Sequence, residues 1–131
     1  MLRSIVLALG IMATSALAQD EPEAVYAKFH RAGLAADYDG MRTYECSAKA
    51  NEMDPIPPGE RKQILQALAR LLPRTYSVVE KTVEEGGKSA LLRLRGTQQD
   101  LDGKPRSVSG TITFVKEKGE WKVDEANWGE R

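Results

Sequence analysis

The stretch FVKEKGEWKV, residues 114–123, decides the fold of this chain. Its centre, Glu117-Lys118-Gly119, is a turn signal, because glycine adopts the positive φ that tight turns need. On both sides of the turn apolar and polar residues alternate, which places successive side chains on opposite faces of a strand. The stretch therefore predicts a β-hairpin with one apolar and one polar face.

Two further turn signals extend this hairpin into a four-stranded antiparallel meander. Residues 85–88 and 100–104 are rich in glycine, aspartate and lysine, and they separate segments with the same alternation. The strands are expected over residues 75–84, 89–97, 106–115 and 121–128. Trp128 has the opposite parity to Trp121 and Val123, so we expect either a β-bulge near residues 124–127 or a change of face.

The residues before the sheet predict three helices, over about 22–36, 39–50 and 60–72, each with an apolar stripe at helical spacing. Three prolines within residues 55–58 forbid a helix through the connection between the second and the third. An antiparallel sheet with one apolar face and helices with matching stripes predict an α+β domain, with the N-terminal helices packed on one side of a four-stranded antiparallel sheet.

Residues 1–18 have the pattern of a cleaved secretory signal. Arg3 precedes an apolar run over residues 5–13, and Ala16 and Ala18 suit cleavage before Gln19. The run is too short to span a membrane comfortably, and no second apolar segment follows. We therefore expect a single domain over residues 19–131, secreted or periplasmic, with no stable membrane insertion after cleavage.

Charge and cysteine content exclude several classes of function. The chain has 19 basic and 19 acidic side chains, and this balance argues against a nucleic-acid partner. Cys46 is the only cysteine, so there is no internal disulfide; it is either a small buried side chain or a thiol that pairs with another chain. One cysteine and one histidine without a ligand-spaced cluster predict no metal site, and we expect no cofactor.

Three features together resemble the nuclear transport factor 2-like (NTF2-like) superfamily, especially its small exported bacterial members. They are the N-terminal helix, a short helix opened by DYDGM at residues 37–41, and the hairpin at residues 114–123. The resemblance covers nearly all of residues 19–131. It implies a cone, in which a curved sheet wraps around helices and a pocket opens at one end. It also implies that a homodimer through the sheet is an expected assembly, because relatives often associate in this way.

Relatives of this kind include enzymes, such as polyketide cyclases, scytalone dehydratase and ketosteroid isomerase, and many non-catalytic binding or dimerisation modules. Our leading hypothesis is an exported non-catalytic binding module for a small ligand or an envelope protein partner. The candidate pocket residues are Tyr26, His30, Tyr44, Arg93, Arg95 and Trp128.

Arg93 and Arg95 project from the same face of one predicted strand. Together with Arg106 they would form a cationic patch for a carboxylate or phosphate group. The alternative is a solvated strand face that is neutralised by Glu80, Glu84 or Asp100.

A second hypothesis is a small pocket enzyme of the isomerase or dehydratase type. His30 would act as general base, and Asp124 would orient its ring or act alone. Tyr26, Tyr38 and Tyr44 would donate hydrogen bonds to a developing oxyanion. The alternative is that His30 is a half-exposed surface residue and Asp124 a solvated strand residue. A third hypothesis is an accessory envelope protein without a ligand.

Overall fold

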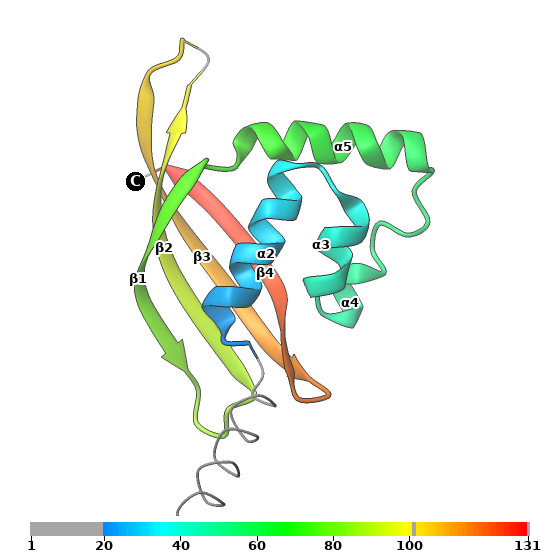
Figure 1. Ribbon diagram of the computed structural model, residues 1–131, viewed down its shortest axis with the longest axis vertical. Coiled ribbons are helices and arrows are strands. Elements are labelled where there is room, and N and C mark those ends of the chain that lie inside the picture. The colour runs from blue at the N-terminus through cyan, green and yellow to red at the C-terminus, as the bar shows by residue number, and fades with distance from the viewer. Residues whose placement is uncertain (1–19, 101, 131) are drawn as a thin grey trace, which may run out of the picture.

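The computed structural model describes residues 20–100 and 102–130, so the predicted signal segment lies outside the described residues. The elements follow one another as α2 (Pro22–Leu34), α3 (Tyr38–Tyr44), α4 (Ser47–Ala50), α5 (Pro58–Leu71), β1 (Thr75–Val83), β2 (Ser89–Gln99), β3 (Pro105–Glu117) and β4 (Glu120–Glu130). The strands form one antiparallel sheet in the order β1-β2-β3-β4. The helices lie together on one side of this curved, twisted sheet (Figure 1). The predicted α+β architecture is confirmed.

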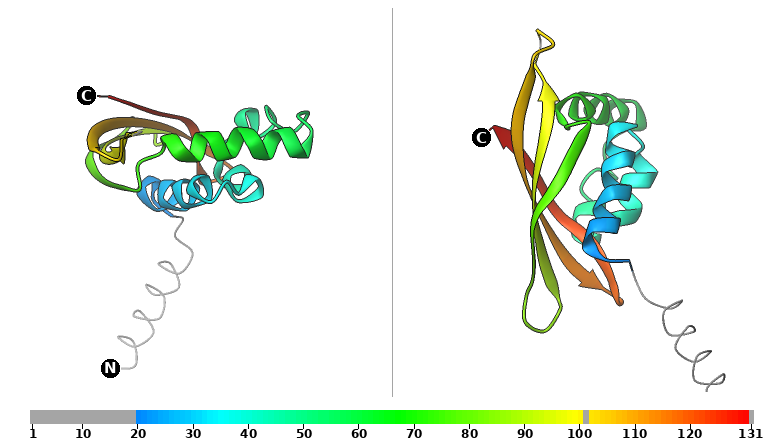
Figure 2. Two further views of the ribbon diagram at one scale, coloured as in Figure 1. Left: turned by 90° about the horizontal axis from the view of Figure 1, so that it is seen from above. Right: turned by 60° about the vertical axis from the view of Figure 1, so that its left-hand side comes forward.

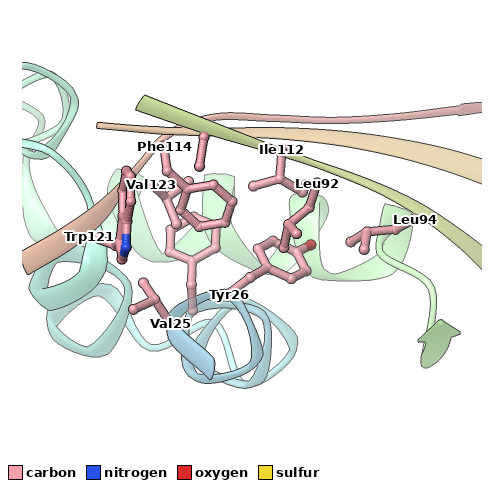
Figure 3. Close-up of a cluster of buried hydrophobic side chains, with 10 residues drawn as sticks. Val25, Tyr26, Leu92, Leu94, Ile112, Phe114, Trp121 and Val123 are labelled. Atoms are coloured by element: carbon pink, nitrogen blue, oxygen red, sulfur yellow. The ribbon is translucent and has the colours of Figure 1, made fainter. Parts of the chain in front are cut away.

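The core lies between α2 and the inner face of the sheet (Figure 3). From β2 and β3 come Leu92, Ile112 and Phe114, which are all at most 1% exposed, and from α2 come Val25 and Phe29. Each such side chain contributes about 1.5–3 kcal/mol through burial of its apolar surface. The alternation along the strands thus fixes which face of the sheet receives the helices.

The hairpin between β3 and β4 forms where the sequence predicts it, with Lys118 and Gly119 at φ angles of 51° and 80°. The register changes between the pair Thr113–Glu125 and the pair Phe114–Val123, so Asp124 is the extra residue of a β-bulge. Of the two alternatives predicted for β4, a β-bulge near residues 124–127 or a change of face, the structure confirms the bulge. It restores the parity of Trp128, which therefore shares the inner face of the sheet with Trp121 and Val123.

The single helix expected over residues 39–50 is wrong, because the structure divides it into α3 and α4. Glu45 and Cys46, which lie between the two helices, have extended backbone with ψ angles of 152° and 157°. Glu45 forms a parallel β-bridge with Val123, and the Cys46 N–H donates to the Val123 carbonyl at 2.8 Å. This pairing with the edge strand β4 gives the Cys46 N–H a backbone partner outside a helix.

Helix α5 lies across the ends of α2 and α3 (Figures 1 and 2). Its first residue is Pro58, which suits a helix start because the first N–H groups have no partner within the helix. Its apolar stripe is only partly covered: Leu65 is 2% exposed, whereas Leu68 and Leu71 are 45% and 62% exposed. The helix therefore packs loosely and leaves a space beneath it.

Within residues 20–100 and 102–130, no helix has both the length and the apolar character needed to cross a membrane.

Candidate functional site

A pocket of about 390 Å³ lies between α5, α3, α2 and β4, and this volume is in the range of small-molecule sites. Its wall is mostly apolar, with side chains from α2, α3 and α5, from the connection before α5 and from the residue after it: Phe29, Met41, Met53, Leu65, Leu68, Leu71 and Leu72. The aromatic side of the pocket is formed by Tyr26, His30 and Trp128, and its polar groups are Tyr38, Glu45, Asp124 and Asn127.

A chain of hydrogen bonds links the aromatic side chains of the pocket. The Trp128 Nε1–H donates to the Tyr26 hydroxyl oxygen at 2.9 Å, and that hydroxyl lies 2.9 Å from His30 Nδ1. His30 Nε2 lies 2.8 Å from the Pro73 carbonyl oxygen. A carbonyl only accepts, so Nε2 carries the ring proton and Nδ1 accepts from the Tyr26 hydroxyl. Both ring nitrogens of His30 are thus engaged in a neutral tautomer.

The surroundings of this network favour uncharged groups. His30 is 4% exposed, and burial lowers the pKa of its ring although the bond to Pro73 acts in the opposite direction. Burial likewise raises the pKa of the Tyr26 hydroxyl far above its usual range. The Tyr76 ring packs edge-on against His30, with 4.9 Å between the ring centroids. His30 is therefore a buried structural histidine, and not the half-exposed surface residue considered above.

The other polar part of the pocket is acidic and lies where the 45–46 segment meets β4. Asp124, the bulge residue, accepts a hydrogen bond from the Cys46 thiol at 3.5 Å. Burial raises the pKa of Glu45, and the nearby charge of Glu52 adds to the shift. No hydrogen bond joins His30 to Asp124 in the part of the chain that the structure describes. Both residues line the pocket, but they do not form an acid–histidine pair.

Cys46 is buried, with 3% of its surface exposed. This agrees with the prediction of a small buried side chain rather than a thiol that pairs with another chain. Burial raises its pKa, and its hydrogen bond to Asp124 raises it further. The thiolate is therefore disfavoured at neutral pH, and the side chain acts as a small core residue.

The remaining predicted site residues lie away from this pocket. Tyr44 packs against the core beneath Lys28, whose Nζ is 5.9 Å from the ring centroid. Arg93 and Arg95 are exposed on the outer face of β2, and Arg93 Nε lies 3.6 Å from Glu80 Oε1. Arg106 pairs with Gln98, a position whose parity is opposite to that of Arg93 and Arg95. The three arginines therefore do not share one face of the sheet.

A charged cluster holds the connection between α4 and α5, the segment in which the pocket residue Met53 lies. Arg42 binds Asp54 with two hydrogen bonds, of 3.0 Å from Nε and 2.7 Å from Nη2, and the Tyr38 hydroxyl also donates to Asp54. The Arg61 guanidinium lies 4.0 Å from the centroid of the Tyr38 ring. The bonds from Arg42 and Tyr38 lower the pKa of Asp54 to about 2.

Sequence reasoning missed Glu45, Asn127 and the leucines of α5 as pocket residues. The sequence predicts Glu45 inside a helix, and only its pairing with β4, at Val123, places it at the pocket. The sequence predicts the apolar stripe of α5, but only the structure shows that Leu65 is its buried residue and that Leu68 and Leu71 line the pocket.

Among the described residues no group of three or more His, Cys, Asp or Glu side chains could hold a metal ion.

No protein-family model matches the sequence, and no curated protein matches it either. Solved structures do match. A SEC-C motif containing protein from Rhodopseudomonas palustris superposes with a TM-score of 0.64 and 16% identity, over 90% of this chain and 86% of that one. A protein from Campylobacter jejuni named as an NTF2-like transpeptidase superposes with a TM-score of 0.57 and 17% identity, over 81% of this chain and 99% of that one. A protein from Streptomyces avermitilis named as a dehydratase of the NTF2-like family superposes with a TM-score of 0.51 and 14% identity, over 83% of this chain and 93% of that one. At these identities the likeness establishes the fold and no activity: the chain has the NTF2-like fold.

Proposed function

We propose that this protein is an exported, non-catalytic binding module that holds a small, mainly apolar ligand in the pocket beneath α5. The observation that carries the proposal is the engagement of both ring nitrogens of His30, the only histidine of the chain. A general base needs a free lone pair within reach of the substrate. His30 has none, because Nδ1 accepts from Tyr26 and Nε2 donates to Pro73.

The other groups of the enzyme hypothesis are engaged as well. The Tyr26 hydroxyl donates its proton to His30, and the Tyr38 hydroxyl donates to Asp54, so neither proton points to a developing oxyanion. Asp124 lines the pocket but has no histidine partner among the described residues. The site is therefore a pocket without a positioned acid–histidine pair.

The wall of the pocket supports an apolar ligand. Leu68 and Leu71 of α5 are 45% and 62% exposed, and both line the pocket. A ligand in contact with them removes apolar surface from water at about 25 cal/mol per Å². The polar groups are few, which is typical of sites where a small number of hydrogen bonds orient an otherwise apolar molecule.

Export is supported by the order of the features in residues 1–18: one early positive charge, a short apolar run, and small residues before Gln19. N-terminal sequencing of the protein recovered from the culture medium or periplasm tests it. We expect the chain to begin at Gln19, and recovery of an intact Met1 in the cytoplasm would contradict export.

Binding is tested with 1-N-phenylnaphthylamine, an apolar probe whose fluorescence rises in apolar sites. We expect saturable binding that Leu68→Gln weakens. Val79→Gln is the matched control, because Val79 is 59% exposed on β1 and does not line the pocket. Native mass spectrometry of protein purified from its own compartment adds an independent measurement. Absence of saturable probe binding, together with a bare protein mass, would overturn the proposal.

A further inference from the structure

We infer that the pocket binds its ligand and a proton in competition, and that His30 is the group that takes the proton. Acid then releases a ligand that the protein retains at neutral pH. This regulation rests on the binding function proposed above and acts at the same site. Two features of the structure support it: a buried titratable ring in the wall of the pocket, and hydrogen bonds that suit only its neutral form.

The His30 ring is enclosed by aromatic side chains that belong to the wall of the pocket. It is 4% exposed, and its centroid lies 4.9 Å from that of Tyr76 and 6.3 Å from that of Trp128. Tyr26, one turn earlier on α2, is 1% exposed, and its ring centroid lies 5.4 Å from that of His30. Tyr26, His30 and Trp128 all line the pocket. A charge on the His30 ring therefore acts on the surface that a ligand contacts.

The hydrogen bonds around His30 fit the neutral ring and not the charged one. Nδ1 accepts the Tyr26 proton, and the Tyr26 oxygen accepts from Trp128 Nε1–H. A proton on Nδ1 makes this nitrogen a donor, so the Tyr26 hydroxyl has to turn its own proton away. Within residues 20–100 and 102–130 that proton has no acceptor other than His30. A buried donor without an acceptor destabilises the charged state of the network.

Among the described residues no charged side chain compensates a protonated His30. Burial lowers the pKa of the ring, the bond to the Pro73 carbonyl opposes the shift, and neither cause is a charged group. Helix α5 contributes only leucines to the pocket. The titratable or charged side chains on the other surrounding elements are Arg31 on α2, Tyr38 on α3, Glu45 before α4, Arg74 and Tyr76 at the start of β1, and Asp124 on β4.

An apolar ligand strengthens this preference for the neutral ring. A ligand that fills the pocket removes water from the side of the aromatic network that faces it, and desolvation disfavours a charged imidazole. A charged ring, in turn, disrupts the contact between Tyr26 and Trp128 that shapes the wall. Because linkage is reciprocal, a ligand that prefers the neutral form must also lower the pKa of His30.

Two measurements on the unsubstituted protein test the competition. Binding of 1-N-phenylnaphthylamine, a diarylamine that stays neutral in this range, is followed from about pH 8 to about pH 5, with circular dichroism to verify folding. One pH unit below the NMR midpoint of the ring in the free protein, we expect binding to be weaker several-fold, and by no more than about tenfold, because one proton is linked. A saturating concentration of the probe should lower the NMR midpoint of His30.

Two substitutions assign the effect to His30. His30→Gln keeps a donor and an acceptor but has no titrating group, so its affinity for the probe should no longer fall in acid. Glu45→Gln is the matched control, because Glu45 also lines the pocket and burial raises its pKa. Protonation of Glu45 makes the pocket less polar and favours the probe, so this variant should keep the loss of binding in acid.

The outcomes separate the competition from the binding function. Saturable binding that does not weaken in acid, an unchanged His30 midpoint with saturating probe, or the same loss in His30→Gln would each overturn the competition and leave the binding function standing. Absence of saturable binding at every pH would overturn both. The NMR midpoint is measured on the unsubstituted chain, so it decides the question even where His30→Gln does not fold.

Discussion

Gly110 of β3 and Trp128 of β4 lie directly opposite each other, and the indole ring covers the space where a side chain on residue 110 would stand. A Cβ atom at Gly110 would lie 2.8 Å from three ring atoms of Trp128. The glycine thus lets the ring lie flat on the sheet, where its Nε1–H reaches Tyr26. A residue without chemistry of its own determines the position of one side of the pocket.

Gly110→Ala should therefore displace Trp128 and break its hydrogen bond to Tyr26. We expect a loss of about 2 kcal/mol in the free energy of unfolding from overpacking, measured by urea denaturation. Gly129→Ala is the control, because a Cβ at Gly129 meets nothing within 4 Å. Equal effects of the two substitutions would contradict the close approach of Gly110 and Trp128.

The titration of His30 should show its burial directly. It is the only histidine, so its ring signals in NMR are unambiguous, and we expect a midpoint below the ordinary pKa of 6.5 because burial lowers it. Between the folded and the unfolded pKa the unfolded chain binds more protons than the folded protein. The stability from His30 is therefore complete above about pH 6.5 and falls as the pH drops through this window.

His30→Gln keeps a donor and an acceptor without a titrating group, so it should reduce this loss of stability between about pH 7.5 and about pH 5.5. A midpoint at or above 6.5 in the unsubstituted protein would mean that the ring is not desolvated.

Replacement by alanine should affect the free energy of unfolding very differently at two leucines of α5. Leu65 is 2% exposed, so Leu65→Ala should lower the free energy of unfolding by about 3 kcal/mol. Leu71 is 62% exposed, so Leu71→Ala should change it by less than about 0.5 kcal/mol and weaken binding of the apolar probe instead. Denaturation curves for both variants test the packing of α5, and similar losses would contradict it.

The Cys46 thiol should react slowly in the folded protein. It is buried and burial raises its pKa, so little thiolate is present and accessible. The control is a double variant, Cys46→Ser with Ser47→Cys, which moves the single thiol to the neighbouring exposed position. We expect Ellman's reagent to modify Cys46 at least about tenfold more slowly than the thiol of this control, and rapidly in denaturant. Fast reaction of the native thiol would show that residues 45–46 open readily from β4.

Asp54→Asn should loosen the connection between α4 and α5. The bidentate bond from Arg42 weakens, and limited proteolysis should cut more quickly near residues 51–57, with Glu52→Gln as the neighbouring control. In the unsubstituted protein this pair persists in acid, because the pKa of Asp54 is lowered to about 2 and the pair is lost only as the pH falls toward that value. Unchanged proteolysis would show that other contacts hold the connection.

Features that depend on neighbouring residues in the sequence could be predicted, and those that depend on distant partners could not. The parities of Trp121 and Trp128 predict either a bulge near residues 124–127 or a change of face, and the structure has the bulge, at Asp124. The break at Glu45 does not, because the local pattern is compatible with a helix and the pairing with Val123 outweighs it. The role of His30 depends on Pro73, 43 positions away, so its burial is invisible in the sequence around it.

The two sides of the pocket come from separate stretches of chain, since one wall is α5 and the opposite side is the aromatic network on α2 and β4. Sequence change in Leu68 and Leu71 can therefore alter what the pocket accepts while the sheet core keeps its residues. This separation makes the chain a scaffold for redesign: a library restricted to positions 68 and 71 of α5, with Leu65 kept, would vary ligand choice at nearly constant stability.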